Sequence, residues 1–440
     1  MSAALQPDPD PTPAELIAAR PHLSMHAMDG LLVEDVPLNA IADAVGTPTW
    51  VISAGCLRAR LSALQAALAS LGARVHYAVK ANDHLAILNL MARNGAGADV
   101  VSGGELRRAL LAGVPALRIV FSGVGKQEWE LRLAVEAGVG QINVESAEEL
   151  AMLSQIASAA GRTAPIALRI NPDVDAGTHA KITTGRAENK FGIGYDAALA
   201  LYAHAATLPG IEPIGIALHI GSQILSIAPF AAAYARAAEL VRALRAGGQS
   251  IRTVDCGGGL GIGYRDDPAP APEAFAAAIG RAFAGLGLEL AVEPGRWLVG
   301  PAGLLLTSVV LSKVTANRRF VVLDAAMNDL LRPAMYEAWH AIVPVSAVDA
   351  LAPAAPADIV GPVCETGDTF ARSRILPMVR PSSRLAILDA GAYGSVMSST
   401  YNARPLAAEV LVDGGRWSVI RARQKLEDLW AGETVPEWLG

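Results

Sequence analysis

The chain has 440 residues, of which 52% are hydrophobic and 18% are charged, and its formal net charge is −6. This composition excludes a disordered chain, which would have few apolar residues and many charges. The acidic balance and the lack of any run of Lys or Arg argue against a general binder of nucleic acid. At roughly 100–200 residues per domain, the length predicts two or three domains.

The first 24 residues are rich in Pro and Ala and lack the basic and apolar regions of a secretory signal, so we expect a flexible tail. The longest apolar stretch, residues 297–311, is shorter than the roughly 20 residues of a membrane-spanning helix. Three cysteines, Cys56, Cys256 and Cys364, lie far apart and form no CxxC pair. We therefore expect no metal site, no disulfide framework and a cytoplasmic location.

Short apolar runs then alternate with Ala- and Leu-rich segments of helical period. Continuous apolar strands, each followed by a helix, are typical of a parallel sheet covered by helices. Eight such units over about 250 residues predict a (β/α)8 barrel of the TIM type, with a doubly wound open sheet as the alternative. The predicted strands are 75–79, 99–101, 119–121, 141–144, 166–170, 215–219, 253–255 and 290–293, and the predicted helices include 85–94, 104–112, 128–137, 147–160 and 230–246.

After about residue 304 the pattern changes to strands with few helices between them. The turn Asp413-Gly414-Gly415 between the last two strands predicts a hairpin. We expect a barrel at 49–303 and a separate, mainly antiparallel β domain at 304–440, of barrel or sandwich type, which the segment 25–48 joins. The predicted strands are 304–314, 319–323, 358–363, 384–389, 407–412 and 417–422.

Functional groups of such a barrel lie on loops after the C-terminal ends of the strands. Lys80 follows the first predicted strand and His219 ends the sixth. Burial favours the neutral amine of a lysine, which can attack a carbonyl and form a Schiff base. A lysine that reaches from a strand end to solvent is an equally good interpretation, and a lone histidine is more often a satisfied polar group.

Two further loops follow the seventh and eighth strands. The glycine run 257–261 can bring backbone N–H groups close to a phosphate, and the segment from Glu293 to Arg296 can share that phosphate. A tight turn without a ligand is the alternative. A carboxylate such as Glu293 keeps a pyridine nitrogen protonated, although a salt bridge to Arg296 would also explain it. In the β domain, Cys364 stands among charged residues and can donate a proton, whereas an inert cysteine is the commoner case.

Taken together, these motifs resemble the alanine-racemase-like class of pyridoxal-phosphate-dependent decarboxylases. Among its members, those that act on meso-2,6-diaminopimelate are the most similar. No single motif decides the resemblance, but their order over residues 30–425 is specific. The matching segments are 77–82, 99–105, 179–185 with 190–193, 219–223, 257–261, 293–296, 332–336, 364–368, 391–393 and 397–402.

The resemblance implies pyridoxal 5'-phosphate as cofactor and decarboxylation of meso-2,6-diaminopimelate to L-lysine. It implies that Lys80 forms the Schiff base, that His219 stacks on the pyridine ring, that Glu293 binds the ring nitrogen and that Cys364 protonates the product. The implied phosphate and cofactor contacts are Ser222, Gly257, Gly258, Gly259, Pro294, Gly295, Arg296 and Tyr393. The implied substrate contacts are Arg296, Arg332, Tyr336, Glu365 and Tyr393.

The distal end of this substrate carries a carboxylate and an ammonium. Arg296 or Arg332 can bind the carboxylate and Glu365 the ammonium. In relatives, the segment around Cys364 reaches the partner's active site, which implies a homodimer with shared sites. The alternatives are an ornithine, arginine or carboxynorspermidine decarboxylase, a lysine-dependent aldolase without pyridoxal phosphate, and a non-catalytic regulatory paralogue. We expect no nucleic-acid or membrane partner.

Overall fold

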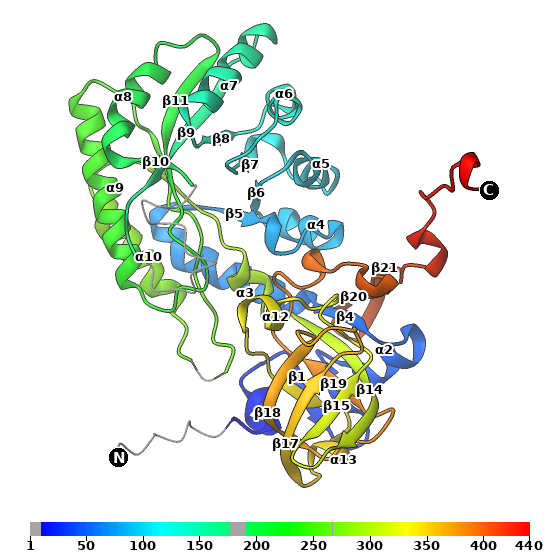
Figure 1. Cartoon of the computed structure of the whole chain (residues 1–440). Coiled ribbons are helices and arrows are strands. Elements are labelled where there is room, and N and C mark those ends of the chain that lie inside the picture. The colour runs from blue at the N-terminus through cyan, green and yellow to red at the C-terminus, as the bar shows by residue number, and fades with distance from the viewer. Residues whose placement is uncertain (1–9, 176–190, 266) are drawn as a thin grey trace, which may run out of the picture. The chain divides into compact units, whose positions relative to one another are not determined.

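The computed structural model describes residues 10–175, 191–265 and 267–440. The chain divides into two compact units (Figure 1). The barrel unit comprises residues 57–263 and 268–299. The sheet unit comprises the chain up to residue 56, residues 264–267 and residues 300–440. The described helices include none that is long and apolar enough to cross a membrane.

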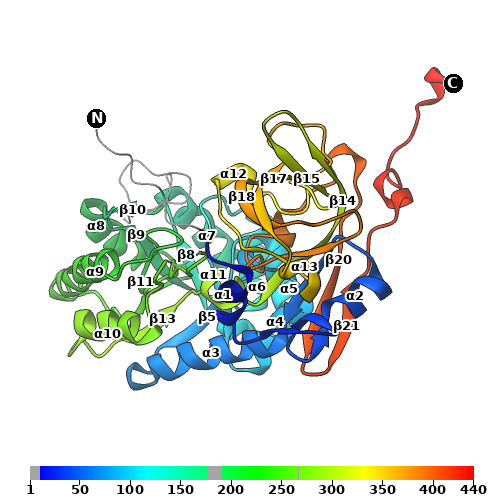
Figure 2. The same ribbon diagram turned by 90° about the horizontal axis from the view of Figure 1, so that it is seen from below.

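The barrel unit contains a closed ring of eight parallel strands, as the alternation of strands and helices predicts (Figures 1 and 2). Pairing of β8 with β9 closes the ring, which rules out the open sheet. A two-residue strand, β10 (Ile193–Gly194), adds to β9. The ring consists of β5 (Arg74–Ala78), β6 (Gly97–Val100), β7 (Ile119–Phe121), β8 (Gln141–Val144), β9 (Ala164–Asn171), β11 (Ile211–Leu218), β12 (Thr253–Asp255) and β13 (Glu289–Val292).

Helices follow the strands and begin at residues that cap them. Ser102 and Ser146 accept the N–H groups of Glu105 and Glu149 at two of these starts. The helices are α3 (Ala54–Leu68), α4 (Leu85–Arg93), α5 (Gly103–Leu111), α6 (Glu128–Ala137), α7 (Ala147–Ala159), α8 (Tyr195–Ala205), α9 (Ala228–Ala246), α10 (Pro272–Phe283) and α11 (Arg296–Val299). Short 3-10 turns occur at η1 (Ala69–Leu71), η2 (Val79–Ala81) and η3 (Ala116–Arg118).

Several barrel strands carry buried polar side chains where branched apolar residues usually fill such an interior. Asp99 on β6, Asn143 on β8 and Asp255 on β12 are each at most 2% exposed. Gln141 Nε2 donates to Asn143 Oδ1 at 2.7 Å, and Asn143 Nδ2 donates to Ser122 Oγ at 3.0 Å. Because buried polar groups need partners, this network indicates that the strands were selected for a site as well as for packing.

The sheet unit is built on a mainly antiparallel sheet, as predicted, with parallel pairs only at β15–β17 and β4–β20 among the described strands. The order is β18-β17-β15-β14-β4-β20-β21, and β19 pairs with β14 and β16. The predicted hairpin is present, since Asp413 pairs with Arg416. The strands are β4 (Thr49–Ser53), β14 (Gly303–Val314), β15 (Arg319–Leu323), β16 (Ile342–Pro344), β17 (Ala354–Val360), β18 (Thr369–Pro377), β19 (Arg384–Ile387), β20 (Ala408–Asp413) and β21 (Arg416–Arg421).

A small sheet and several short helices complete this unit. The small sheet contains β1 (Leu23–His26), β2 (Gly30–Val33) and β3 (Val36–Pro37). The helices are α1 (Pro13–Ala18), α2 (Leu38–Val45), α12 (Arg332–Tyr336) and α13 (Ala347–Ala350), with 3-10 turns at η4 (Ser395–Met397), η5 (Tyr401–Ala403), η6 (Leu426–Leu429) and η7 (Glu437–Leu439).

The strand at Thr49–Ser53 does not enter the barrel, in contrast to the prediction that the barrel begins at residue 49. It pairs antiparallel with β14 and parallel with β20, and all five of its residues are buried in the sheet unit. A short apolar run indicates a buried strand but contains no information about its partners, so the sequence could not distinguish the two units here.

The prediction of a flexible tail over residues 1–24 is also wrong for its described part, residues 10–24. Thr12 and Glu15 form a capping box at the start of α1. Leu16 and Ile17 are buried in the hydrophobic core of the sheet unit, and Arg20 forms a buried ion pair with Asp389. The high proline content hid this short helix, although Pro13 stands at its first position, where proline is favourable.

Candidate active site in the barrel

A cavity of about 380 Å³ opens at the C-terminal ends of the barrel strands. Three residues singled out in the sequence, Lys80, His219 and Glu293, line the same cavity. Its remaining walls include Ser122, Asn143, Arg169 and Phe191, together with backbone of the glycine-containing turn at residues 123–125. The strands therefore bring a lysine, a histidine and a carboxyl group from distant parts of the chain to one enclosed space.

Lys80 lies in the 3-10 turn η2 that directly follows β5. Its Nζ donates to Asp99 Oδ2 at 2.6 Å, and the Asp99 side chain is fully buried while that of Lys80 is partly exposed. Asp99 holds the amine in a defined place at the cavity wall.

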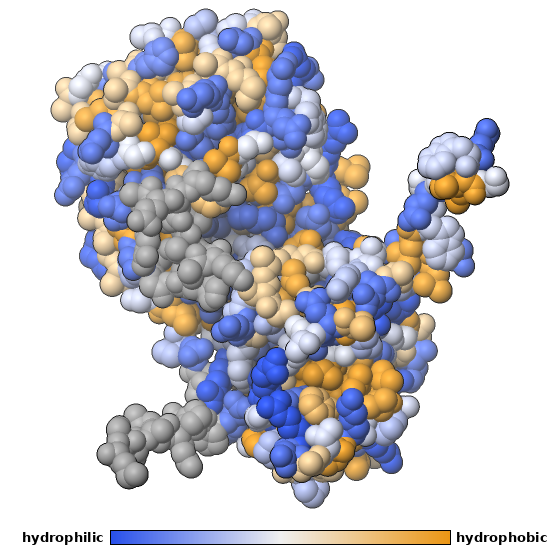
Figure 3. All heavy atoms as spheres, viewed as in Figure 1, coloured by the Kyte–Doolittle hydropathy of each residue, from blue (hydrophilic) through white to orange (hydrophobic). Residues whose placement is uncertain are grey.

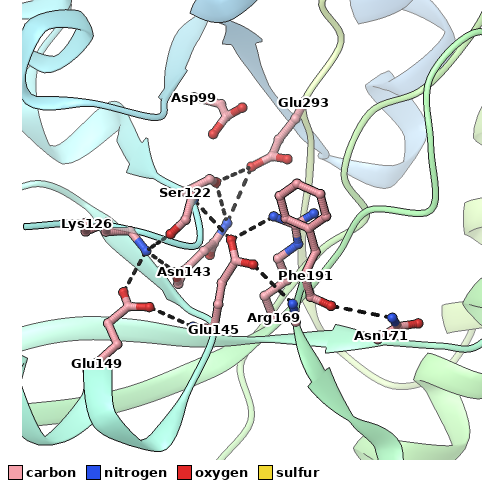
Figure 4. Close-up of polar contacts among 12 residues, drawn as sticks. Asp99, Ser122, Lys126, Asn143, Glu145, Glu149, Arg169, Asn171, Phe191 and Glu293 are labelled. Carbon is pink, nitrogen blue, oxygen red and sulfur yellow. Dashed lines mark hydrogen bonds and ion pairs between the residues drawn. The ribbon is translucent and has the colours of Figure 1, made fainter. Parts of the chain in front are cut away.

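Glu293 follows β13, and its side chain is 6% exposed. Glu293 Oε1 accepts from Ser122 Oγ at 3.4 Å and from Asn143 Nδ2 at 3.5 Å (Figure 4). Burial, with the neighbouring carboxyl groups of Asp255 and Asp99, holds the pKa of Glu293 well above its ordinary value. The cavity therefore contains a carboxyl group with a high affinity for a proton.

His219 lies directly after β11 and lines the cavity. Burial lowers its pKa well below the ordinary value, and the nearby cations of Arg169 and Lys80 lower it further. The imidazole is therefore neutral at neutral pH. A neutral, flat ring at the wall of the cavity is suited to stacking on another aromatic ring.

The glycine run after β12 is packed too closely for side chains. A Cβ atom at Gly257 would meet the carbonyl oxygen of Leu218, and one at Gly258 would meet that of Glu293. Gly257 and Gly259 adopt φ angles of +69° and +103°, which favour glycine. The loop therefore passes close to the ends of β11 and β13, and Gly257 and Gly258 are buried there. Two of the predicted phosphate contacts meet, since the buried Arg296 donates from Nη2 to Ser222 Oγ at 3.1 Å.

A second polar cluster, absent from the predicted site, supports another wall of the cavity (Figure 4). Lys126 Nζ is buried and donates to the carbonyls of Gly123 and Asn143 and to Glu149 Oε1, at 2.6–2.8 Å. The Lys126 side chain has no exposed surface, so the hydrogen-bond donors of its ammonium group must find their partners within the barrel. Lys126 thereby joins the turn at residues 123–125 to β8.

Glu145 continues this cluster toward Phe191. Glu145 Oε1 accepts from Arg169 Nη1 at 2.7 Å, and Glu145 Oε2 accepts the Gly192 N–H at 3.1 Å. The Arg169 guanidinium lies 4.9 Å from the centre of the Phe191 ring, a cation–π contact. These contacts hold Phe191 at the cavity wall. The motif at residues 179–185 lies outside the residues that the structure describes. The same is true of Lys190, which immediately precedes Phe191.

The remaining predicted site residues belong to the sheet unit. Arg332 Nη1 lies 2.8 Å from His340 Nε2, and its guanidinium stacks 4.7 Å from the centre of the Tyr264 ring. Cys364 is exposed, and its backbone N–H donates to Asn402 Oδ1 at 2.9 Å. Glu365 is also exposed, and Tyr336 and Tyr393 are half-buried. Asp368 holds the loop that carries Cys364, because it accepts the N–H groups of Met327 and Val363 at 2.7 Å.

Sequence reasoning did not assign site roles to Asp99 or Asp255. Both are almost fully buried in barrel strands, and both influence Glu293 through their charge. The sequence signal that could have identified them is an aspartate among apolar strand residues. Burying an aspartate costs free energy, so its presence there indicates a functional role. Asp255 also stands two residues before the first glycine of the run.

The chain was compared with known proteins. The family model of the pyridoxal-binding domain of pyridoxal-dependent decarboxylases matches residues 55–300. A diaminopimelate decarboxylase from Zymomonas mobilis is 50% identical over 414 residues, covering 93% of this chain and 98% of that protein. A crystal structure of diaminopimelate decarboxylase from Helicobacter pylori complexed with L-lysine has 40% sequence identity and a TM-score of 0.87, covering 90% of this chain and 98% of that chain. The enzyme from M. jannaschii, also in complex with L-lysine, has 36% identity and a TM-score of 0.91, covering 96% of this chain and 99% of that chain.

Proposed function

The chain belongs to the diaminopimelate decarboxylases, pyridoxal-phosphate-dependent enzymes that convert meso-2,6-diaminopimelate to L-lysine and carbon dioxide, and we propose that the cavity of the barrel unit is where it carries out this reaction. The observation that carries the proposal is the meeting of Lys80, His219 and Glu293 at one cavity. A lysine for covalent attachment, a flat neutral ring for stacking and a carboxyl group for the ring nitrogen suit a pyridoxal cofactor.

The residues present fit pyridoxal 5'-phosphate. The glycine loop at Gly257, Gly258 and Gly259 would hold its phosphate, with Ser222, Pro294, Gly295 and Arg296 as further contacts. Lys80 would bind its aldehyde carbon, His219 would cover one face of its ring, and Glu293 would contact the ring nitrogen. When bound, the cofactor supplies the electron sink that accepts the charge released as carbon dioxide leaves.

The protein's own residues orient the reactants. Asp99 holds the Lys80 amine in place through a 2.6 Å hydrogen bond. Glu293 is buried, and a protonated ring nitrogen beside it would favour its ionised form, whose charge would then act strongly on that nitrogen. Phe191, held by Arg169, lines the same cavity.

We propose that Arg296 of the barrel unit and four residues of the sheet unit are substrate contacts. The distal carboxylate of the substrate would bind Arg296 or Arg332, the distal ammonium would bind Glu365, and Tyr336 and Tyr393 would also contact the substrate. Cys364 would donate the proton that replaces the lost carboxylate. Its exposed thiol, on a loop anchored by Asp368, is consistent with such a role.

Release of carbon dioxide by the purified holoenzyme tests this function. Meso-2,6-diaminopimelate, ornithine, arginine and L-lysine are supplied in parallel, and the amine product is quantified. We expect carbon dioxide from meso-2,6-diaminopimelate alone, with an equal amount of L-lysine. Release from ornithine or arginine would assign a different substrate to the same chemistry. No release from any of the four, with the cofactor bound, would favour a regulatory paralogue.

We further propose a cytoplasmic homodimer whose active sites are shared between subunits. All three cysteines, each within the described residues, are thiols, which is consistent with a reducing compartment. Leu311 and Val314 on β14 and Ile375 on β18 are among the exposed apolar side chains of the sheet unit. Figure 3 shows hydrophobic residues on the face of the sheet unit that is turned toward the viewer. Exposed apolar patches are typical of faces that bind another protein.

Mixing two inactive variants tests whether the sites are shared. Lys80→Ala lacks the proposed anchor and Cys364→Ala lacks the proposed acid, so each homodimer should lose most activity. After dissociation and random reassociation, half of the dimers contain one intact site of two, so we expect about a quarter of wild-type activity to return. The CO2 assay before and after mixing measures this recovery. No recovery, with mixed dimers demonstrated by affinity tags, would place Lys80 and Cys364 of one subunit in the same site.

A further inference from the structure

His340 is a buried histidine of the sheet unit that contacts Arg332, one of the two arginines that the proposed function offers to the distal carboxylate of the substrate. It lies between α12 and β16 and is 1% exposed. Its Nε2 lies 2.8 Å from Arg332 Nη1, and its Nδ1 lies 2.9 Å from the carbonyl oxygen of Leu388. The imidazole ring therefore connects the Arg332 side chain to the backbone of the sheet.

The chemistry of these two partners determines which nitrogen of His340 carries the proton. An arginine guanidinium only donates hydrogen bonds, and a carbonyl oxygen only accepts them. Nε2 must therefore accept from Arg332, while the Nδ1–H group donates to Leu388. An imidazolium ring would instead place a donor and a second positive charge 2.8 Å from Arg332, so His340 is the neutral Nδ1–H tautomer.

The position of the His340 ring is set by the surrounding sheet. The carbonyl of Ala341 accepts the N–H of Leu388 at 2.8 Å, next to the ladder in which β16 pairs with β19. Arg374 Nη1 donates to the carbonyl of His340 at 2.8 Å. The backbone on both sides of the ring is thus bound independently of Arg332, so the ring can act as a fixed acceptor for it.

Tyr264 makes a second contact with the same guanidinium. The Arg332 guanidinium carbon lies over the Tyr264 ring, 4.7 Å from its centre, and the rings of Tyr264 and His340 meet edge to face at 5.2 Å. The five N–H donors of a guanidinium share one plane, so these two contacts restrict the directions in which all of them point. Both partners are neutral, so they orient the charge of Arg332 without neutralising it.

We propose that His340 is a positioning residue, which orients the guanidinium of Arg332 for the distal carboxylate of the substrate. The proposal rests on the proposed function and deepens it, because it assigns this carboxylate to Arg332 and not to Arg296. Arg296 donates to Ser222 Oγ, which is itself one of the groups proposed for the phosphate. A bidentate contact between arginine and carboxylate depends on direction, so its affinity gains from a guanidinium that is already oriented.

Two ligands that differ by one carboxylate test this role. Carbon dioxide leaves from one end of meso-2,6-diaminopimelate, so L-lysine retains the distal carboxylate and the distal ammonium. Pentane-1,5-diamine has the same carbon chain and both amino groups but no carboxylate. Calorimetry with the holoenzyme measures the Kd of each ligand, and carbon dioxide release measures kcat and KM for meso-2,6-diaminopimelate.

Asparagine and glutamine at position 340 separate the orientation of Arg332 from packing. The amide oxygen of glutamine reaches about as far as Nε2 and can accept from Arg332, whereas the amide of asparagine ends near Nδ1 and can contact only Leu388. We expect His340→Asn to raise the Kd for L-lysine and the KM for meso-2,6-diaminopimelate about tenfold, through loss of one hydrogen bond to a charged group. The kcat and the Kd for pentane-1,5-diamine should stay within about threefold of the wild type, because only carboxylate binding is weakened. His340→Gln should restore most of the affinity for L-lysine.

His76→Asn is the matched control, because His76 is a buried histidine of the barrel unit. It is 6% exposed, its Nδ1 lies 3.1 Å from the carbonyl oxygen of Arg118, and it is not among the residues that line the cavity. Both His76→Asn and His340→Asn should unfold at a lower urea concentration than the wild type, since each leaves a void in a packed interior. Only His340→Asn should bind L-lysine more weakly.

Three results would overturn the proposal. His340→Asn could bind L-lysine as tightly as the wild type, it could lose affinity equally for L-lysine and pentane-1,5-diamine, or His340→Gln could fail to restore binding. In each case, carbon dioxide release from meso-2,6-diaminopimelate by the wild type would leave the proposed function intact. A wild type that neither releases carbon dioxide from this substrate nor binds L-lysine would instead refute the proposed function, and the role of His340 with it.

Discussion

A Lys80→Ala variant should lose at least about 10³-fold in kcat, because covalent attachment of the cofactor then has no amine. The factor by which kcat falls should be the same with every substrate, because Lys80 attaches the cofactor and does not select the substrate. The visible absorption band of the lysine-bound cofactor should also disappear. The measurement combines CO2 release at saturating cofactor with the absorption spectrum of the same sample.

Lys126 provides a matched control for this experiment. It is a second buried lysine of the barrel mouth, with three hydrogen bonds, but it does not line the cavity. A Lys126→Met variant should unfold at a lower urea concentration, because it leaves Glu149 buried without its cation. It should nevertheless retain the visible band. If the visible band survived in Lys80→Ala and disappeared in Lys126→Met, the cofactor anchor would be Lys126 and the assignment to Lys80 would be wrong.

A Glu293→Gln variant should lose about 10²–10³-fold in kcat, the usual effect of removing one preorganised electrostatic group from an active site. Glutamine keeps the size and hydrogen-bonding capacity of the side chain but has no charge to set against a protonated ring nitrogen. KM should change little, because Glu293 is not assigned to the substrate. The kinetics are measured with cofactor occupancy determined in parallel, so that loss of cofactor is not counted as loss of rate.

Glu130→Gln is the corresponding control for a buried glutamate. Glu130 is 8% exposed and accepts the N–H groups of Gly103 and Gln127, and it does not line the cavity. Its replacement should affect stability and leave kcat unchanged. Equal kcat values for Glu293→Gln and the wild type would remove Glu293 from the proposed mechanism.

The barrel could be predicted almost completely because short strand-like runs alternate regularly with segments of helical period. The predicted ranges 119–121, 141–144 and 253–255 coincide with β7, β8 and β12. Parallel strands covered by helices on the outside have no solvent-facing side, so no polar alternation obscures them. The strand β18 was missed for the opposite reason. Its Arg372 and Ser373 are exposed, so the apolar run is broken.

The candidate site could be predicted as a set of separate motifs but not as a network. Lys80, His219 and Glu293 stand at strand ends, where position alone suggests a function. Asp255 ends a strand too, but a single aspartate before a glycine resembles an ordinary turn signal. It accepts the N–H of Gly257, whose carbonyl accepts the N–H of Glu293 after the neighbouring strand β13, and sequence spacing does not specify which strand ends meet.

The central position of β4 in its sheet has a consequence for synthesis on the ribosome. Its antiparallel partner β14 begins about 250 residues later, and its other partner β20 later still. At roughly 5–20 residues per second, translation leaves β4 unpaired for about 12–50 s while the whole barrel emerges. The nascent chain therefore carries the apolar residues Trp50, Val51 and Ile52 without a sheet to bury them. The barrel can fold during translation, whereas the sheet unit must wait for the last part of the chain.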